Sequence, residues 1–150
     1  MSATNVFVKY RIGRYEVQEP LGVGGMARVY IGWDTVLERP VAIKFLHDHL
    51  AEDAMFIERF KREAKLVATL DHPNIVQIYD FDIYPKTDHP YLVMELVEGV
   101  SLARYLRDET RDNRLLPLED VARIMVEVGQ ALIYAHRRGL VHRDVKPQNV

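Results

Sequence analysis

The chain has 150 residues, of which 48% are hydrophobic and 28% are charged, so it is long enough for one modest domain or two small lobes and too apolar for a disordered segment. Its net charge of −2 gives no basic field, which argues against nucleic acid or an anionic membrane as a partner. It contains no cysteine, which excludes disulfides and thiolate chemistry and permits a reducing compartment.

The amino-terminal residues predict neither a targeting signal nor a membrane anchor. Residues 1–10 lack the apolar core of a signal peptide, and no apolar run in the chain is long enough to cross a bilayer. We therefore expect a soluble, cytoplasmic chain without a membrane segment, whose residues 1–14 form a tail with little to pack.

A glycine-rich stretch, Gly22–Ala27, lies between two predicted strands. Tyr15, Val17 and Leu21 suggest the first strand, and Arg28–Trp33 is rich in strand formers. Glycine lets backbone N–H groups come close to a ligand. A Rossmann loop should open a helix, and a P-loop needs Gly-Lys-Ser/Thr, so neither fits. Either a structural hairpin or a hairpin that covers phosphates remains.

The next predicted strand, Val41–Leu46, carries a lysine and a small residue on the same face. Side chains alternate along a strand, so Val41, Ile43 and Phe45 share one face while Ala42 and Lys44 share the other. A small residue beside a charge suits a flat ligand with a charged tail. The alternative is a solvated lysine at the edge of a sheet.

A helix is predicted over Asp53–Leu70, with a carboxylate inside its apolar stripe. The stripe consists of Phe56, Phe60, Val67 and Leu70. Glu63 lies within this stripe, where burial of a carboxylate costs free energy unless the carboxylate is paired with a cation. Lys44 is the candidate partner; the alternative is that Glu63 lies at the margin and pairs with Arg59. The other charges are interpreted as a solvated face: Glu58, Arg59, Lys61, Arg62 and Lys65.

Two further strands are predicted over 74–79 and 91–96, joined by the turn-rich segment Pro85–Pro90. Residues 15–96 then hold five mostly antiparallel strands and one helix. Helices are predicted over Leu102–Arg107, capped by Ser101, and from Pro117 to Arg138, with the polar loop 111–116 between them. The second helix is apolar on most sides, so we expect marginal solubility where it lacks packing partners.

The polar run Val141–Val150, VHRDVKPQNV, carries the strongest chemical pattern. Asp144 can take a proton, Lys146 can pair with phosphate, and Asn149 can bind a metal through its amide oxygen. Phosphoryl transfer needs such groups, because its catalysis is mostly positioning and charge neutralisation. The alternative is a solvated polar turn. The other histidines show no metal spacing and are interpreted as structural or surface residues: His47, His49, His72, His89 and His136.

Three motifs together resemble the protein kinase family. H-R-D-x-K-P-x-N matches the catalytic loop, V-A-I-K matches the phosphate-binding strand, and G-x-G followed by Val29 matches the glycine loop, except that Ala27 replaces its third glycine. Lys146 and the glycine loop resemble bacterial serine/threonine kinases. The resemblance implies an α+β, kinase-like fold: a five-stranded antiparallel N-lobe with one helix over 15–96, and over 97–150 the hinge and the start of a mainly helical C-lobe.

The resemblance also implies the residue roles, with ATP and Mg²⁺ as cofactors and a protein serine or threonine hydroxyl as the acceptor. Gly22 and Gly24 would cover the phosphates, Leu21, Val29 and Ala42 would enclose adenine, and backbone groups of Glu95 and Val97 would bind its edge, beside the gatekeeper Met94. Lys44, positioned by Glu63, would hold phosphate. Asp144 would be the catalytic base, Lys146 would contact the transferred phosphoryl group, and Asn149 would bind magnesium.

The family's second metal ligand, an aspartate in Asp-Phe-Gly, has no counterpart in the 150 residues. We therefore expect little or no phosphotransfer by this chain alone. The alternative function is a non-catalytic nucleotide-binding or interaction module; a small-molecule phosphotransferase is a weaker third.

Overall fold

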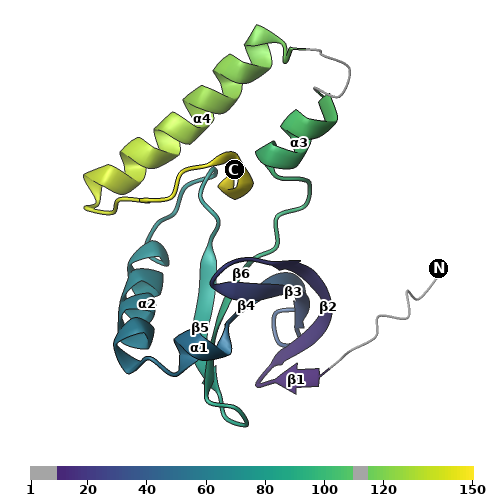
Figure 1. Cartoon of the computed structure of the whole chain (residues 1–150), viewed down its shortest axis with the longest axis vertical. Coiled ribbons are helices and arrows are strands. Elements are labelled where there is room, and N and C mark those ends of the chain that lie inside the picture. Colours follow the sequence, from purple (N-terminus) through teal and green to yellow (C-terminus); the bar gives the residue numbers. More distant parts are fainter. Residues whose placement is uncertain (1–9, 110–114) are drawn as a thin grey trace, which may run out of the picture. The chain divides into compact units, whose positions relative to one another are not determined.

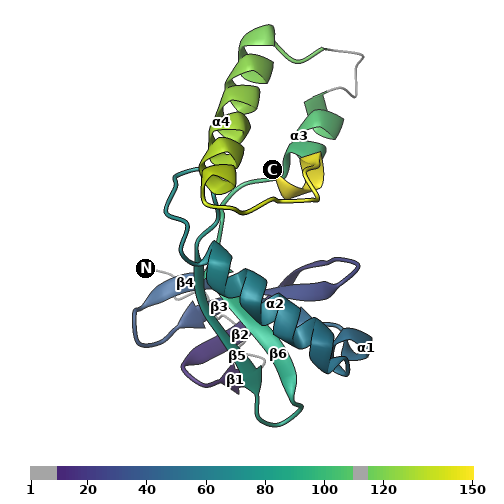
Figure 2. The same cartoon turned by 90° about the vertical axis from the view of Figure 1, so that its left-hand side faces the viewer.

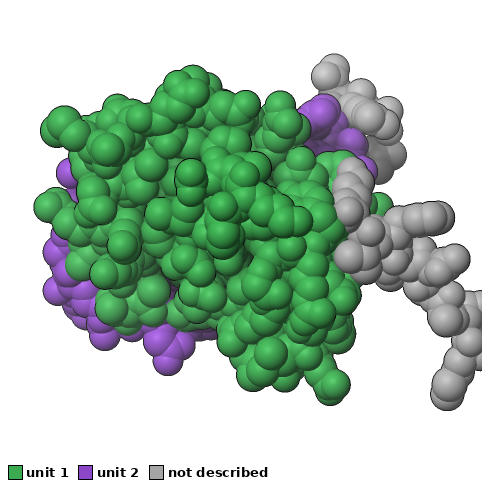
Figure 3. Space-filling view, turned by 90° about the horizontal axis from the view of Figure 1, so that it is seen from below, with its two compact units in different colours: residues 1–69, 76–96 green, residues 70–75, 97–150 purple. Residues whose placement is uncertain are grey.

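The computed structural model describes residues 10–109 and 115–150. By its internal contacts the chain divides into two compact units, which Figure 3 shows in separate colours. The first unit runs to Thr69 and resumes over Val76–Leu96, and it is here called the sheet unit. The second comprises Leu70–Ile75 and Val97–Val150, and it is here called the helical unit.

The sheet unit is built on a curled antiparallel sheet of six strands in the order β1-β2-β3-β4-β6-β5 (Figure 1). The strands are β1 (Tyr10–Ile12), β2 (Tyr15–Val23), β3 (Ala27–Asp34), β4 (Arg39–Leu46), β5 (Ile78–Tyr84) and β6 (His89–Glu95). The expected count of five was wrong by one. β1 lies in the segment predicted to be a tail and pairs with β2, where Ile12 is buried opposite Tyr15.

The expected phosphate-side hairpin is formed by β2 and β3. Gly24 donates its backbone N–H to the carbonyl of Ala27 at 2.8 Å, which closes the turn. The last predicted strands also form a hairpin, β5–β6, but β5 begins at Ile78 rather than at Asn74. Residues 74–77 stay irregular because the Ile75 N–H donates to the His72 carbonyl, which closes a turn that contains Pro73.

The core of the sheet unit lies on one face of the sheet, as the alternation in β4 predicted. Its fully buried members are Ile12, Tyr15, Val17, Val41, Ile43, Tyr91 and Val93. A Cβ added to Gly32 would overlap the Cδ1 atom of Ile43 and come within 2.9 Å of its Cγ1 atom. The absence of a side chain in β3 therefore makes room for the central isoleucine of β4.

Two helices follow β4 in the sheet unit (Figure 2): α1 (Asp48–Ala51), which was not predicted, and α2 (Ala54–Val67). The Asp53 side chain caps α2 by accepting hydrogen bonds from the backbone of Met55 and Phe56. The helix ends at Val67, three residues before the predicted end. It lies beside β5, where the rings of Phe60 and Phe81 are 5.9 Å apart.

The helical unit contains α3 (Leu102–Glu109), α4 (Leu118–Arg137) and the short 3-10 helix η1 (Pro147–Asn149). Ser101 Oγ accepts from the backbone of Arg104 at 3.4 Å, in the predicted cap. Of the predicted loop 111–116, residues 111–114 lie outside the described part of the chain. Within the part that is described, no helix is both long and apolar enough to span a membrane.

Candidate functional site

The register of the sheet aligns several predicted nucleotide-binding residues in one cross-strand row. Gly22 lies opposite Val29, Val29 opposite Lys44, and Lys44 opposite Leu92. Directly opposed residues share a face, so Val29 and Lys44 lie side by side on the face away from the core. Ala42, one pleat further along β4, lies opposite Met94.

Lys44 is held in a partly dry environment. Its side chain is half-buried, and burial lowers the pKa of its ammonium group below the usual value. Within residues 10–109 and 115–150 no ion pair reaches Lys44. A half-buried cation without an anion is poised to gain from a negatively charged ligand, since such a ligand offsets the cost of desolvation.

The expected ion pair between Lys44 and Glu63 is not among the ion pairs of the described residues, and neither is the alternative pair with Arg59. Glu63 is exposed, while Ala64 is the buried residue of α2. The apolar stripe predicted from the sequence differs from the buried side of α2, because it included Leu70, which lies beyond the end of the helix. Without Leu70 the inward face turns toward Phe60 and Ala64, and Glu63 falls at its margin.

The glycine loop leaves space at its two leading glycines. A Cβ at Gly22 would meet nothing within 4 Å, and one at Gly24 would approach only the carbonyl of Ala27 at 3.7 Å. Packing within the chain therefore does not explain these glycines, and the close approach of a ligand to them stays a prediction. Ala27 is 2% exposed, so its extra Cβ is buried in the protein and does not obstruct that approach.

His47 holds the tip of the glycine loop, a role that the sequence did not reveal. Its ring Nε2 lies 2.8 Å from the carbonyl oxygen of Gly24, and its backbone N–H donates to Met26 at 3.0 Å. The sequence predicts only a structural or surface role for His47, because the histidines show no metal spacing. Its register position explains the contact, since Leu46 pairs with Ala27.

The predicted adenine-edge residues lie at the end of β6 and just after it. Glu95 is fixed twice to Gln77: its backbone N–H donates to the Gln77 carbonyl at 2.9 Å, and its carboxylate accepts from the Gln77 N–H at 3.1 Å. Val97 is exposed and belongs to the helical unit, and Leu21 of β2 is 52% exposed. A nucleotide contact at Glu95 and Val97 stays a prediction.

The helical unit brings the three predicted catalytic side chains together. The Lys146 Nζ lies 2.8 Å from Asp144 Oδ2, and the Asn149 Nδ2 donates to the same oxygen at 3.1 Å and to the Asp144 carbonyl at 2.8 Å. The hydrogen bond from Lys146 is the main cause that lowers the pKa of the Asp144 carboxyl. Asp144 is therefore an ionised carboxylate at neutral pH, exposed to solvent and able to accept a proton from an approaching hydroxyl.

The backbone of the loop makes this convergence possible. Arg143 adopts a left-handed conformation with φ of 64°, which reverses the chain just before Asp144. The Asp144 N–H donates to Nδ1 of His142 at 3.2 Å, so the ring of His142 helps to hold the backbone of the loop. Asn149 is returned toward Asp144 by the turn of η1, in which its N–H donates to the Lys146 carbonyl at 2.9 Å.

The oxygen atoms of this cluster suit a hard divalent cation. Because Asn149 donates its amide hydrogens to Asp144, its Oδ1 faces the other way and is available as a ligand. Mg²⁺ commonly binds through one or two protein oxygens, with waters and phosphate oxygens completing its shell. No group of three His, Cys, Asp or Glu residues suited to a metal occurs in the described part of the chain.

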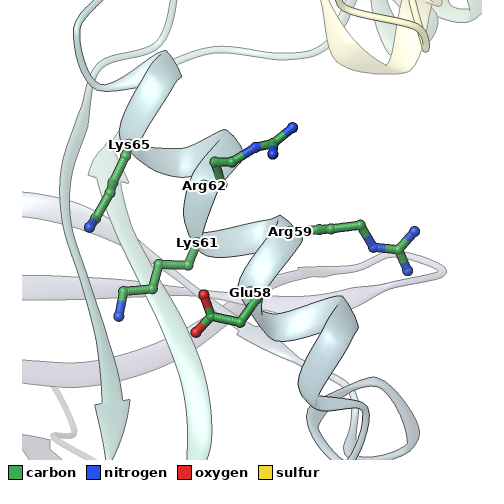
Figure 4. Close-up of a pocket in the computed structure, with 5 residues that line it drawn as sticks. All are labelled: Glu58, Arg59, Lys61, Arg62 and Lys65. Atoms are coloured by element: carbon green, nitrogen blue, oxygen red, sulfur yellow. The ribbon is translucent and has the colours of Figure 1, made fainter.

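A hollow of about 370 Å³ on α2 includes none of the predicted nucleotide-binding or catalytic residues. It is lined by Glu58, Arg59, Lys61, Arg62 and Lys65. Figure 4 shows that Arg59 and Arg62 point to one side of the helix while Lys61, Lys65 and Glu58 point to the other. The side chains diverge, which agrees with the prediction that they form a solvated face.

Comparison with known proteins decides the family. The model of the protein kinase domain matches residues 15–150. The chain belongs to the protein kinase family. This match confirms the resemblance in the three motifs at the level of the family and its fold. Members of this family are in general ATP- and Mg²⁺-dependent enzymes that act on proteins.

Relatives of this kinase chain are bacterial serine/threonine kinases. It is 46% identical over 140 residues to the serine/threonine-protein kinase PksC of Streptomyces coelicolor, covering 92% of this chain and 25% of the relative. It is also 46% identical over 138 residues to PrkC of Bacillus subtilis, covering 92% of this chain and 20% of the relative. The chain thus spans a quarter or less of these relatives.

The kinase domain of Mycobacterium tuberculosis PknI has a similar fold. The two structures superpose with a TM-score of 0.81 at 33% sequence identity, covering 95% of this chain and 56% of the PknI chain.

Proposed function

We propose that this chain supplies the nucleotide-binding sheet and the catalytic loop of a bacterial-type serine/threonine protein kinase. The reaction is transfer of the γ-phosphate of ATP to a serine or threonine hydroxyl of a protein. The observation that carries the proposal is the cluster of Asp144, Lys146 and Asn149, whose side-chain contacts are 2.8–3.1 Å long. A carboxylate, a cation and an amide oxygen in one place meet the needs of phosphoryl transfer.

The nucleotide is bound by the row of residues on β2, β3 and β4. Gly22 and Gly24 let the backbone approach the phosphates, and Leu21, Val29 and Ala42 enclose the adenine. The half-buried ammonium of Lys44 pairs with the α- and β-phosphates. Glu63 positions Lys44 only after α2 rotates or shifts, since its carboxylate is exposed in this structure.

In the catalytic loop, Asp144 orients the acceptor hydroxyl and takes its proton as the oxygen attacks the γ-phosphorus. Lys146 leaves Asp144 to neutralise charge on the transferred phosphoryl group. Asn149 would hold Mg²⁺ through Oδ1, and the ion would neutralise phosphate charge when bound. A cytoplasmic location follows from the proposal, because an ATP-dependent kinase acts where ATP is available.

A domain exchange tests the proposal. The chain replaces the matching segment of PksC, and transfer of labelled γ-phosphate to a protein substrate is measured. We expect transfer, with Asp144→Asn lowering its rate about 100-fold or more at unchanged ATP affinity. The 150-residue chain tested alone should show little transfer.

The alternative is a non-catalytic nucleotide-binding module, and the missing Lys44–Glu63 ion pair favours it. An exchanged domain that melts cooperatively and binds ATP, yet transfers no phosphate, would establish this alternative and reject the kinase proposal.

A further inference from the structure

A second hollow, of about 310 Å³, lies within the helical unit between the carboxyl end of α4 and the segment Leu70–Ile75. It is lined by His72, Gln130, Ile133, Tyr134, Arg137 and Arg138. Two of these residues are cations, and none is a carboxylate. It shares no residue with the predicted nucleotide or catalytic sites.

Contacts within the hollow fix the side chains that line it. The guanidinium carbon of Arg138 lies 3.7 Å from the centre of the Tyr134 ring, so Arg138 is stacked rather than free in solvent. The ring of His72 lies 5.0 Å from the same tyrosine ring. Tyr134 therefore organises a cation and an imidazole around itself, which reduces the entropy that a ligand would have to remove.

The existing hydrogen bonds leave donors available to a ligand. The backbone N–H of Asp71 donates to the Tyr134 hydroxyl oxygen at 3.2 Å, so the phenolic hydrogen is left to donate elsewhere. The backbone N–H of Asn74 donates to Nδ1 of His72 at 3.1 Å, which places the ring hydrogen on Nε2. Of the lining groups, two guanidiniums, one amide, one phenol and one imidazole can thus donate.

We propose that this hollow binds a phosphate monoester. Two guanidinium groups line this one hollow and match a dianion in charge, and a planar guanidinium fork matches phosphate oxygens in geometry. The hydroxyl of Tyr134 and the Nε2–H of His72 serve the remaining oxygens, with Gln130 at the rim. On α2, by contrast, the cations point to two sides of the helix, and Glu58 lies among them.

The ligand has two possible sources, a small phosphorylated metabolite or a phosphorylated serine or threonine of a protein. Both present the same monoester group. The test therefore uses sn-glycerol 3-phosphate and a blocked phosphoserine tripeptide as separate probes. The unphosphorylated tripeptide and glutarate, a carboxylate dianion, are the comparison ligands.

The experiment is a titration of the ¹⁵N-labelled 150-residue chain, followed through its amide resonances at low salt. We expect saturable shifts at Asp71, Asn74 and Gly139 with both phosphate probes, with a Kd on the order of 1 mM. Phosphate bound to the glycine loop is distinguished because it shifts Gly24 instead. A tighter Kd for the phosphopeptide identifies a protein ligand, and equal values identify the phosphoryl group alone; both support the site.

Variants separate a built site from general charge. Arg137→Gln with Arg138→Gln should weaken binding about tenfold, whereas Lys61→Gln with Lys65→Gln, which removes the same charge from α2, should change it less than about twofold. Arg137→Lys with Arg138→Lys keeps the charge but loses the forks, and it should weaken binding about threefold. The amides of Tyr105 and Ala131 check that the helical unit of each variant remains folded, and those of Val17 and Ile43 check the sheet unit. Equal loss in the two glutamine pairs, equally tight binding of glutarate, or no saturable shift would overturn the proposal.

Discussion

The two units differ in how their functional residues are held. In the sheet unit Lys44 belongs to a strand whose neighbours Val41 and Ile43 are completely buried, so its position depends on a packed core. In the helical unit Asp144, Lys146 and Asn149 are all exposed and are positioned by hydrogen bonds to one another. Its buried apolar residues within the described chain are Leu70 and Ala131.

This difference indicates two levels of stability. Buried apolar area is the main source of folding free energy, and the sheet unit holds most of it. Along α4, Leu118, Met125 and Ile133 are each more than half exposed. We therefore expect the helical unit to open at a lower free energy than the sheet unit.

The largest expected effect is on the core of the sheet unit. Ile43→Ala should lower its free energy of unfolding by about 3 kcal/mol, because it leaves a cavity beside Gly32. Ile133→Ala on the exposed side of α4 is the matched control and should cost less than about 1 kcal/mol. Urea unfolding followed by the fluorescence of Trp33 in β3 measures the sheet unit, and hydrogen exchange of the amides of α4 measures the helical unit. Similar costs would show that the two units do not differ in packing.

The next effect concerns nucleotide affinity. Lys44→Met should weaken ATP binding to the chain about tenfold, because the half-buried cation is lost where phosphate binds. Titration calorimetry gives the Kd. Lys86→Met, in the exposed turn between β5 and β6, removes the same charge and should leave the Kd unchanged. Equal losses would assign the effect to net charge.

A smaller effect is expected at the glycine loop. His47→Ala removes the donor to the Gly24 carbonyl and should weaken ATP binding about threefold, since the loop must then be ordered by the ligand. His47→Gln can still present a side-chain N–H and should recover most of the affinity. Failure of glutamine to recover it would argue that the ring packs rather than donates.

The smallest effect is electrostatic and lies in the catalytic loop. Lys146→Met should raise the pKa of the Asp144 carboxyl toward its ordinary value, because the main group that favours the carboxylate is removed. The lowered pKa of Asp144 contributes stability above its unfolded pKa, and this is lost as pH falls through the folded value. The carboxyl ¹³C shift followed against pH measures the change. Lys61→Met should leave that curve unaltered.

The sequence predicted local features best. Alternation in β4 identified the face that packs on the core. Eight consecutive residues of the catalytic loop, 142–149, predicted a cluster whose members Asp144, Lys146 and Asn149 are close together in the sequence. Asp53 revealed the start of α2 because its cap is a contact with the next three residues. The hairpin at Gly24 was likewise predictable from glycine placed between strand formers.

Features that depend on distant contacts were missed. β1 has only three residues, and its strand character comes from pairing with β2. The exposure of Glu63 depends on where α2 ends and on which side packs against Phe81, and neither is encoded by the stripe alone. The hollow at Arg138 required two segments, 70–75 and α4, that are far apart in sequence.

The bond between His47 and the glycine loop also bears on the timing of nucleotide exchange. The loop is already held at Gly24 and Met26 in the folded chain. Binding of a nucleotide therefore removes less conformational entropy from the loop. The same fastening must break if the loop is to lift away from a spent nucleotide. His47 would then slow the release of a bound nucleotide as well as favour its binding.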